Sequence, residues 1–309
     1  MTTPLLRIGT RGSPLALWQA NRVRDGLVAA LGGDEAAVEI VAIRTTGDAI
    51  QDRPLSEAGG KGLFVKEIDE ALLAGRVDLA VHSAKDLPTE LAPNTVLAAT
   101  LPRADVRDAF IGGGAATLDA LPRGAIVGTA SLRRGALVKR LRPDVEVVSF
   151  RGNVQTRLDK LARGEVQATL LALAGLDRLG LAAHATEILD EEAFPPALGQ
   201  GAIAVTARHD DERTHAALNA LNCVDTAAAL VCERAFLAVL DGSCRTPLAG
   251  LARVTEGVMR FRGMVLSLDG SEVVEGSVAG DASEAAALGA EAGRDVKGRT
   301  PAALLAAFG

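Results

Sequence analysis

The sequence predicts an α/β fold with two α/β domains and a small α+β domain at the C-terminal end. A length of 309 residues exceeds one ordinary domain, and 48% hydrophobic with 23% charged residues is typical of a globular chain with several cores. Short apolar runs that end at Gly, Ser or Thr alternate with amphipathic stretches through residues 5–201, as strands and helices do in α/β folds. After Asp225 this alternation gives way to a different pattern.

The first α/β unit begins with a strand, and its helices carry clear end signals. Ser13 and Pro14 are residue types preferred at the N-cap and the first position of a helix, and Gly75 is of the type that ends one. The expected elements are a strand Leu5–Thr10, a helix from Pro14, a strand Val38–Thr45, a helix Gly62–Ala74 and a strand Val77–His82.

The second unit lies between two proline-containing segments, Leu101–Arg103 and Phe194–Pro196. We expect these to be hinges, because proline removes a backbone donor where regular structure ends. Its expected strands are Asp108–Gly112, Ala125–Thr129, Val145–Phe150 and Ala168–Ala172, and its expected helices are Leu132–Leu141 and Asn153–Arg163. A strand Gly201–Ala207 is expected to return to the first sheet, which makes the first domain discontinuous.

The C-terminal part shows longer elements. We expect a helix Thr226–Leu240, a turn that contains Cys244, two strands and an alanine-rich helix from Ser283; the strands are Met259–Leu268 and Glu272–Val278. The expected domains are therefore 1–101 with a return segment 202–219, then 102–201, and finally 220–309.

Charge and composition exclude several classes of partner. A net charge of −6 disfavours nucleic acid and anionic membranes, and 3% aromatic residues offer few platforms for stacking bases. No uncharged apolar run reaches the roughly 18–20 residues of a membrane-spanning helix. The three cysteines and four histidines lack metal-site spacing, and the odd cysteine count argues against a disulfide framework. With no signal-like segment at the start, we expect a cytoplasmic chain without a metal.

One segment is strongly basic within this acidic chain. Residues 131–163 hold nine basic and three acidic residues, a net charge of +6. A solvated helix face is our interpretation for Lys139, Arg140, Arg142, Lys160 and Arg163. Residues 128–134 instead close a strand with small hydroxyl residues and open a helix with Arg133 and Arg134, and Arg151 precedes the cap residue Asn153 in the next unit. Helix N-termini and guanidinium groups at strand ends favour a carboxylate or phosphate, so we predict an anion site there.

The first unit carries matching features. Arg11 follows the first strand, and Lys61 lies within Gly59–Gly62, whose spacing does not fit a phosphate-binding P-loop. The polar segment Thr46–Gly60 fits a lid or a solvated linker equally well. In His82–Pro88 an apolar strand runs into polar residues, where Asp86 can stabilise a developing positive charge or move protons; the alternative is a surface ion pair with Lys85.

The cysteines divide into two groups. Cys223 and Cys232 lie in or beside apolar helical sequence, which predicts buried small hydrophobes. Cys244 lies in a tight turn beside Arg245, which favours the thiolate. We interpret Cys244 as a thiol for covalent attachment, with a chance loop cysteine as the alternative.

At these motifs the chain resembles the hydroxymethylbilane synthase family, also called porphobilinogen deaminase. The motifs are Leu6–Ala20, Gly59–Glu67, His82–Pro88, Gly128–Arg134, Arg151–Asn153, Gly199–Gly201 and Gly242–Pro247. The resemblance implies two domains similar to periplasmic solute-binding proteins, hinged around a central cleft, and a third domain. It implies a dipyrromethane cofactor held as a thioether on Cys244. It also implies a transferase of tetrapyrrole biosynthesis that joins four porphobilinogen molecules head to tail, releases ammonia each time and frees linear hydroxymethylbilane with water.

The resemblance also assigns residues. Asp86 would be catalytic, stabilising the cationic azafulvene that forms as ammonia leaves. Lys85, Asp48, Thr129, Ser131, Arg133 and Arg134 would hold the cofactor. Arg11, Ser13, Gln19, Arg151, Arg157, Arg178 and Gln200 would bind porphobilinogen. Lys61 and Phe64 would belong to a lid, in which Glu57 stands where many family members have lysine. The family favours a monomer. A non-catalytic dicarboxylate-binding module is the main rival, and a nucleic-acid binder ranks behind it.

Overall fold

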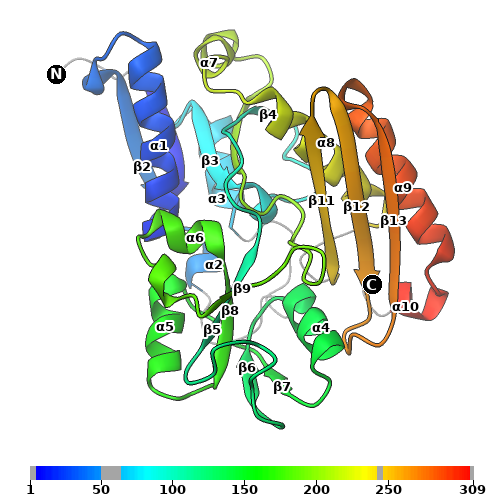
Figure 1. The fold of residues 1–309 in the computed structure, drawn as a ribbon. Helices are drawn as coiled ribbons and strands as arrows, with labels where there is room; N and C mark the ends of the chain where they lie inside the picture. Colours follow the sequence, from blue (N-terminus) through cyan, green and yellow to red (C-terminus); the bar gives the residue numbers. More distant parts are fainter. Residues whose placement is uncertain (1–4, 50–63, 242–245, 307–309) are drawn as a thin grey trace. The chain divides into compact units, whose positions relative to one another are not determined.

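The computed structural model describes residues 5–49, 64–241 and 246–306. By its internal contacts the chain divides into two compact units, residues 1–104 with 202–227 and residues 105–201 with 228–309 (Figure 1). The mixed α/β class is confirmed, since each unit contains a five-stranded sheet with helices in its connections.

The first unit is built on a sheet of order β2-β1-β3-β10-β4. Its elements are β1 (Leu6–Arg11), α1 (Pro14–Ala30), β2 (Val38–Ile43), α2 (Thr46–Ala49), α3 (Lys66–Leu73), β3 (Leu79–Ser83), β4 (Thr95–Thr100), β10 (Ile203–Arg208) and α7 (Glu212–Leu218). Strands β1, β2 and β3 are parallel, whereas β10 is antiparallel to both β3 and β4, so the chain returns to this sheet after the second unit. Apolar residues of α1, among them Val23 and Leu27, pack against β1 and β3.

The second unit repeats this arrangement with the order β7-β6-β8-β5-β9. Its elements are β5 (Asp108–Gly112), β6 (Ile126–Gly128), α4 (Leu132–Leu141), β7 (Glu146–Val148), α5 (Val154–Ala162), β8 (Ala168–Ala172), α6 (Leu173–Arg178) and β9 (Glu187–Ile188). Again three neighbouring strands, β7, β6 and β8, are parallel, and the next strand, β5, is antiparallel. The two sheets therefore share one topology.

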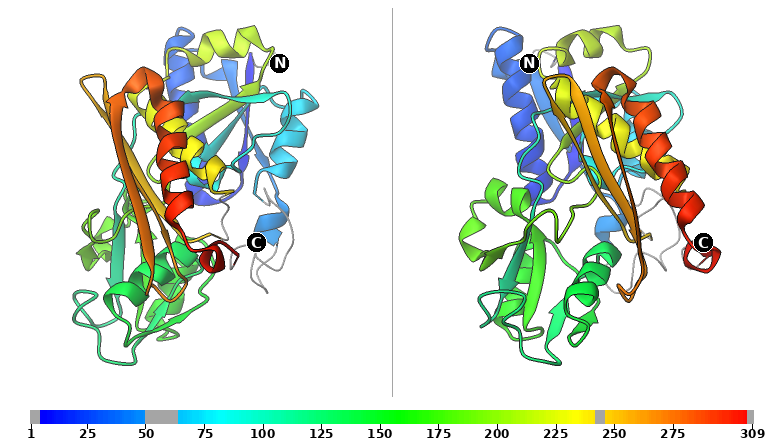
Figure 2. Two further views of the ribbon diagram at one scale, coloured as in Figure 1. Left: turned by 90° about the vertical axis from the view of Figure 1, so that its right-hand side faces the viewer. Right: turned by 45° about the vertical axis from the view of Figure 1, so that its right-hand side comes forward.

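The C-terminal part adds an antiparallel sheet, β11-β12-β13, to the second unit. Its elements are α8 (Val224–Val239), β11 (Leu248–Thr255), β12 (Val258–Leu266), β13 (Val273–Asp281), α9 (Ala285–Arg299) and α10 (Ala302–Ala306). Helices α8 and α9 cover the same face of this sheet (Figure 2), with Phe236, Phe261 and Val296 in the shared core. No helix of the described part of the chain is long and apolar enough to cross a membrane.

Several elements differ from the sequence-based expectations. Strand β11 was not predicted, because Gly250 interrupts its apolar pattern; a Cβ at Gly250 would lie 2.8 Å from the Arg262 carbonyl oxygen of the neighbouring strand. Strand β4 and helices α6 and α7 were also missed. Helix α3 begins at Lys66 rather than at Gly62, since Phe64 and Val65 form a turn before it.

The parallel strands place the predicted site residues at one edge of each sheet. In the first unit the carboxyl ends of β1 and β3 lead to Arg11 and Asp86, and antiparallel β10 begins there with Ile203 paired to Ser83. In the second unit antiparallel β5 likewise begins at this edge, with Asp108 paired to Ala172 at the end of β8. Ligands of open α/β sheets bind beyond such strand ends.

Candidate active site

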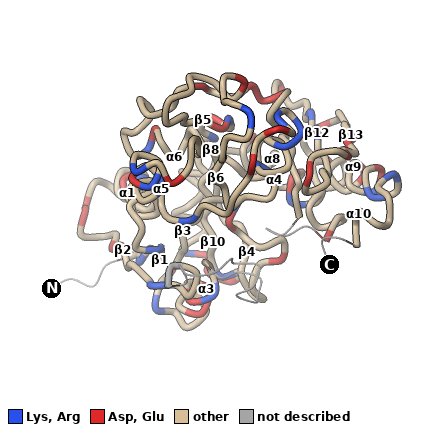
Figure 3. The backbone as a smooth tube through the Cα atoms, turned by 90° about the horizontal axis from the view of Figure 1, so that it is seen from below, with Lys and Arg blue, Asp and Glu red and all other residues tan. Residues whose placement is uncertain are grey.

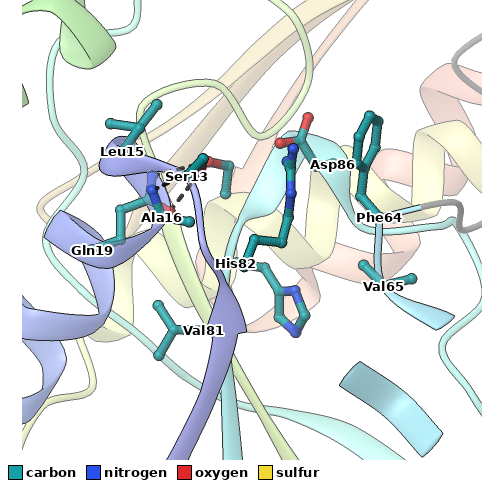
Figure 4. Close-up of a pocket in the computed structure, with 11 residues that line it drawn as sticks. Ser13, Leu15, Ala16, Gln19, Phe64, Val65, Val81, His82 and Asp86 are labelled. Carbon is teal, nitrogen blue, oxygen red and sulfur yellow. Dashed lines mark hydrogen bonds between the residues drawn. The ribbon is translucent and has the colours of Figure 1, made fainter. Parts of the chain in front are cut away.

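A pocket in the first unit brings together five of the predicted site residues. Arg11, Ser13, Gln19, Phe64 and Asp86 line it, together with apolar residues of α1 and β3 (Figure 4). They come from three separate stretches of sequence that meet at the carboxyl ends of β1 and β3. The pocket therefore contains a cation, a carboxylate, a hydroxyl and an aromatic ring.

Side-chain hydrogen bonds hold two of these residues in place, Ser13 and Gln19. The Ser13 hydroxyl caps α1 by accepting a hydrogen bond from the Ala16 N–H at 3.3 Å, as predicted. The side-chain amide of Gln19 is buried and donates through Nε2 to the Ser83 hydroxyl at 2.9 Å. Gln19 thus ties α1 to the end of β3.

Arg11 and Phe64 form a cation–π pair. The guanidinium carbon of Arg11 lies 4.1 Å from the centre of the Phe64 ring. Such a contact orients the guanidinium while leaving donors on its edge for an anion. One face of the Phe64 ring therefore contacts Arg11.

Asp86 lies in a short 3-10 helix, Ala84–Asp86, directly after β3. The strand has already ended there, so the alternation that would point Lys85 and Asp86 to opposite faces of a sheet no longer applies. Asp86 is half-buried and turned toward the pocket (Figure 4). Asp86 therefore supplies a carboxylate to the same pocket as Arg11.

His82 is a neutral buried group of this pocket. Its Nε2 atom lies 3.3 Å from the Thr206 hydroxyl, within hydrogen-bond distance. Burial, together with the positive charge of Arg11, lowers the pKa of His82 to about 4. His82 is thus a buried, hydrogen-bonded and neutral histidine at neutral pH.

In the second unit, Thr129 and Ser131 shape the start of α4. The Ser131 N–H donates to the Thr129 hydroxyl at 3.1 Å, and the Ser131 hydroxyl accepts from the Arg134 N–H at 3.4 Å. Ser131 is the N-cap of α4, directly before the predicted helix start at Leu132. The two hydroxyl residues direct the first turn of α4, which carries Arg133 and Arg134.

Arg133 and Arg134 meet at a carboxylate that the sequence analysis did not assign to the site. Asp108 is fully buried, and its two oxygens accept from Arg133 Nη2 and Arg134 Nη2, each at 2.7 Å. Gln200 Nε2 also donates to Asp108, at 3.0 Å. A charged residue at the start of an otherwise apolar strand, Asp108–Gly112, was the sequence signal that could have revealed it.

The remaining predicted arginines of the second unit follow α5 and α6. Arg151 precedes α5 and is half-buried, and its carbonyl oxygen accepts from Lys160 at 3.2 Å. Arg157 lies in α5, with its Nε atom buried. Arg178 ends α6 and donates to the Gly201 carbonyl oxygen at 2.7 Å, and burial lowers the pKa of its guanidinium.

Arg142 was predicted to lie on a solvated helix face, and this prediction is wrong. Its guanidinium pairs with Asp144 at 2.7 Å and donates to the carbonyl oxygens of Leu118, Asp119 and Leu121. Its side chain is 13% exposed. Arg142 therefore fixes the loop before β6 to the end of α4, a contact with no local sequence signal.

Three predicted positions and one side chain lie beyond what the structure describes. Lys61, Glu57 and Cys244 fall outside the described residues, and Asp48 lies in α2, where only the backbone is described. Of the other cysteines, Cys232 is fully buried, as predicted, and this burial raises the pKa of its thiol to about 12. Cys223 is only half-buried, and its sulfur accepts from the Thr226 hydroxyl.

The donor set of the second unit fits a polycarboxylate such as dipyrromethane. The Nε atom of Arg133 is buried and has no hydrogen-bond partner among the described residues. The trio of Arg133, Arg134 and Asp108 has two positive charges and one negative charge. A cofactor carboxylate would complement both the excess charge and the available donors.

Two family models and two relatives of high sequence identity agree with this chemistry. The family model "Porphobilinogen deaminase, dipyromethane cofactor binding domain" matches residues 6–216, and "Porphobilinogen deaminase, C-terminal domain" matches residues 227–298. The porphobilinogen deaminase of Nitrobacter hamburgensis is 58% identical over 96% of this chain and 94% of its own length. That of Nitrobacter winogradskyi is 57% identical over the same shares. Among solved structures, a TRAP periplasmic solute binding protein from Desulfovibrio salexigens aligns with a TM-score of 0.44 at 12% identity, over 72% of this chain and 73% of that one. The chain belongs to the porphobilinogen deaminase family.

Proposed function

We propose that the chain condenses four porphobilinogen molecules head to tail, with release of ammonia, and frees linear hydroxymethylbilane by hydrolysis. The observation that carries this proposal is the pocket in which the Asp86 carboxylate and the Arg11 guanidinium lie together at the ends of β3 and β1. Porphobilinogen has a basic aminomethyl group, a pyrrole N–H and two carboxylates, so it needs both charges at one place.

Asp86 is the catalytic residue of this proposal. When the carbon–nitrogen bond of the aminomethyl group breaks, ammonia leaves and positive charge develops on the pyrrole. A carboxylate held beside the ring stabilises this charge and accepts a hydrogen bond from the pyrrole N–H. The 3-10 helix after β3 holds the Asp86 backbone in place, which limits reorganisation during the reaction.

The cationic side chains neutralise the carboxylates of the substrate and product. Every added pyrrole brings two carboxylates to a protein whose net charge is −6. In the first unit, Arg11 and Ser13 bind substrate, with Gln19 holding Ser83 beside them. In the second unit, Arg151, Arg157, Arg178 and Gln200 bind substrate carboxylates, and Thr129, Ser131, Arg133 and Arg134 hold the cofactor. Lys85 and Asp48 complete the cofactor contacts, and Lys61 and Phe64 form the lid.

Dipyrromethane, when bound, supplies the pyrrole to which the first substrate is joined. We assign its attachment to Cys244 through a thioether. The buried Cys232 thiol, with its pKa of about 12, is a poor nucleophile, which supports this choice. Arg245 follows Cys244 in the sequence, and a neighbouring cation favours the thiolate.

Intact-mass measurement of the purified protein tests the proposal. We expect an adduct of two pyrrole units that is lost in Cys244→Ser. Asp86→Asn should keep the adduct but lower ammonia release by a factor on the order of 100 or more, because the amide keeps the shape and removes the charge. An unmodified wild-type mass would favour a dicarboxylate-binding module instead, and near-normal turnover of the Asp86 variant would remove Asp86 from its role.

The proposal extends to the state of the protein in the cell. We assign the chain to the cytoplasm as a monomer, because both units have cores of their own and the substrate is a small molecule. Sedimentation at micromolar concentration should give a mass close to 31.8 kDa.

A further inference from the structure

Asp108 stands at the centre of a buried polar cluster in the second unit. It is the first residue of β5, at the edge where β8 ends, and its exposed fraction is 0%. A buried carboxylate is retained at low cost only when donors surround it. Arg133, Arg134 and Gln200 are these donors, and all three were predicted to belong to the site.

The contacts of Asp108 divide between its two oxygens. Oδ2 accepts from Arg133 Nη2 at 2.7 Å, whereas Oδ1 accepts from Arg134 Nη2 at 2.7 Å, Arg134 Nε at 3.1 Å and Gln200 Nε2 at 3.0 Å. An ionised carboxylate offers about four lone-pair sites, enough to accept from these four donors. One carboxylate therefore sets the orientation of three side chains at the same time.

The Nη1 atom of each guanidinium also donates a hydrogen bond, in both cases to a backbone carbonyl oxygen. Arg133 Nη1 donates to the Pro195 carbonyl oxygen at 2.7 Å, and Arg134 Nη1 donates to that of Leu170 at 3.0 Å. Each planar group is thus held at two points, which leaves little freedom of rotation. The two positive charges lie close together. Burial and the charge of Arg134 lower the pKa of Arg133, whereas the negative charge of Asp108 raises it.

We propose that Asp108 is a positioning residue that fixes the pair Arg133 and Arg134 in the orientation that receives the carboxylates of dipyrromethane. The inference rests on the proposed function of Arg133 and Arg134. Asp108 neutralises one of the two guanidinium charges and leaves a net charge of +1 on the trio. The trio therefore attracts an anionic group.

Asp108→Asn tests this role. Asparagine keeps the size of the side chain but replaces one acceptor oxygen with an NH2 donor, which then faces the N–H donors of a guanidinium. We expect a folded protein in which the fraction with the covalent adduct, measured by intact mass, falls at least fivefold below that of the wild type. Circular dichroism checks the fold.

Asp78→Asn is the matched control. Asp78 is a buried carboxylate of the first unit that pairs with Arg7, and it lies at the amino end of β3, away from the pocket. This variant should lose stability and keep its adduct fraction. An Asp108→Asn protein with adduct fraction and kcat/KM within twofold of the wild type, or an equal loss of adduct in Asp78→Asn, would overturn the positioning role.

A second variant, Asp108→Glu, tests the positioning role if Asp108→Asn does not fold. Asp108→Glu keeps the charge and shifts the carboxylate by one methylene, so we expect a folded protein with a partial loss of adduct. A full adduct in Asp108→Glu, or failure of both Asp108 variants to fold, would also overturn the assignment. If the wild type has no adduct and releases no ammonia, the proposed function itself fails, which is a different result.

Discussion

At the residue scale, burial decides which titratable groups of the site can change charge. His82 is 6% exposed, and its imidazole contacts the Thr206 hydroxyl. Because water is excluded and Arg11 is near, the protonated form is disfavoured and the pKa falls to about 4. His82 therefore adds a neutral polar group to the pocket.

The depressed pKa of His82 predicts how stability depends on pH. The unfolded histidine takes up a proton near pH 6.5, whereas the folded one stays neutral until about pH 4, so its stabilising contribution is complete above pH 6.5 and is lost as pH falls. The loss between about pH 7 and pH 5 is about 2 kcal/mol.

Urea unfolding of the wild type and of His82→Gln at both pH values measures this contribution. Glutamine keeps a polar contact for Thr206 but does not titrate, so the variant should lose about 2 kcal/mol less than the wild type over this range. Equal pH dependence of the two proteins would contradict the assignment.

At the element scale, caps and close contacts determine where helices begin and how they pack. Ser13, Ser131 and Asn153 cap α1, α4 and α5 through their side-chain oxygens. The sequence predicted the caps at Ser13 and Asn153. Helices α8 and α9 lie in close contact at Gly289, where an added Cβ would lie 2.0 Å from the Cys232 carbonyl oxygen. This contact is possible only without a side chain at that position.

Gly289→Ala should therefore force α8 and α9 apart. We expect a loss of about 2–4 kcal/mol in the free energy of unfolding, because the obstructing atom belongs to the backbone and cannot rotate away. Gly298→Ala in the same helix is the control: nothing lies within 4 Å of its added Cβ, so it should gain about 0.5–1 kcal/mol. Thermal or denaturant unfolding distinguishes the two, and similar stabilities would refute the close contact.

At the scale of the whole molecule, net charge and local charge have opposite signs. The chain has a net charge of −6, and Figure 3 shows acidic and basic positions interspersed along it. Residues 131–163 nevertheless have a net charge of +6. Local cations act on an anionic substrate over about 10 Å at ordinary ionic strength, so they should outweigh the more distant acidic groups.

The salt dependence of kcat/KM reveals whether the local positive charge of residues 131–163 or the net negative charge of the chain controls substrate binding. If the arginines dominate, raising NaCl from about 0.05 to 0.5 M should lower kcat/KM for porphobilinogen several-fold, because salt screens the attraction. The value of kcat at saturating substrate should change less. An increase of kcat/KM with salt would show that repulsion by the net negative charge governs association.

The sequence by itself determined the local features of this protein. Helix α4 and strands β5 and β8 have the bounds predicted for them, since cap residues, apolar runs and glycines act within a few positions of the chain. The motifs also predicted the family, which the comparisons confirm.

Only the tertiary structure decided which distant residues meet. Asp108 contacts residues 25, 26 and 92 positions away because antiparallel β5 pairs with β8 and begins where the parallel strands end. Strand order and pairing depend on the packing of whole elements, and no short stretch of sequence records them. The counter-charge of Arg133 and Arg134, the buried role of Arg142 and the pairing of Arg11 with Phe64 are set by the same long-range packing.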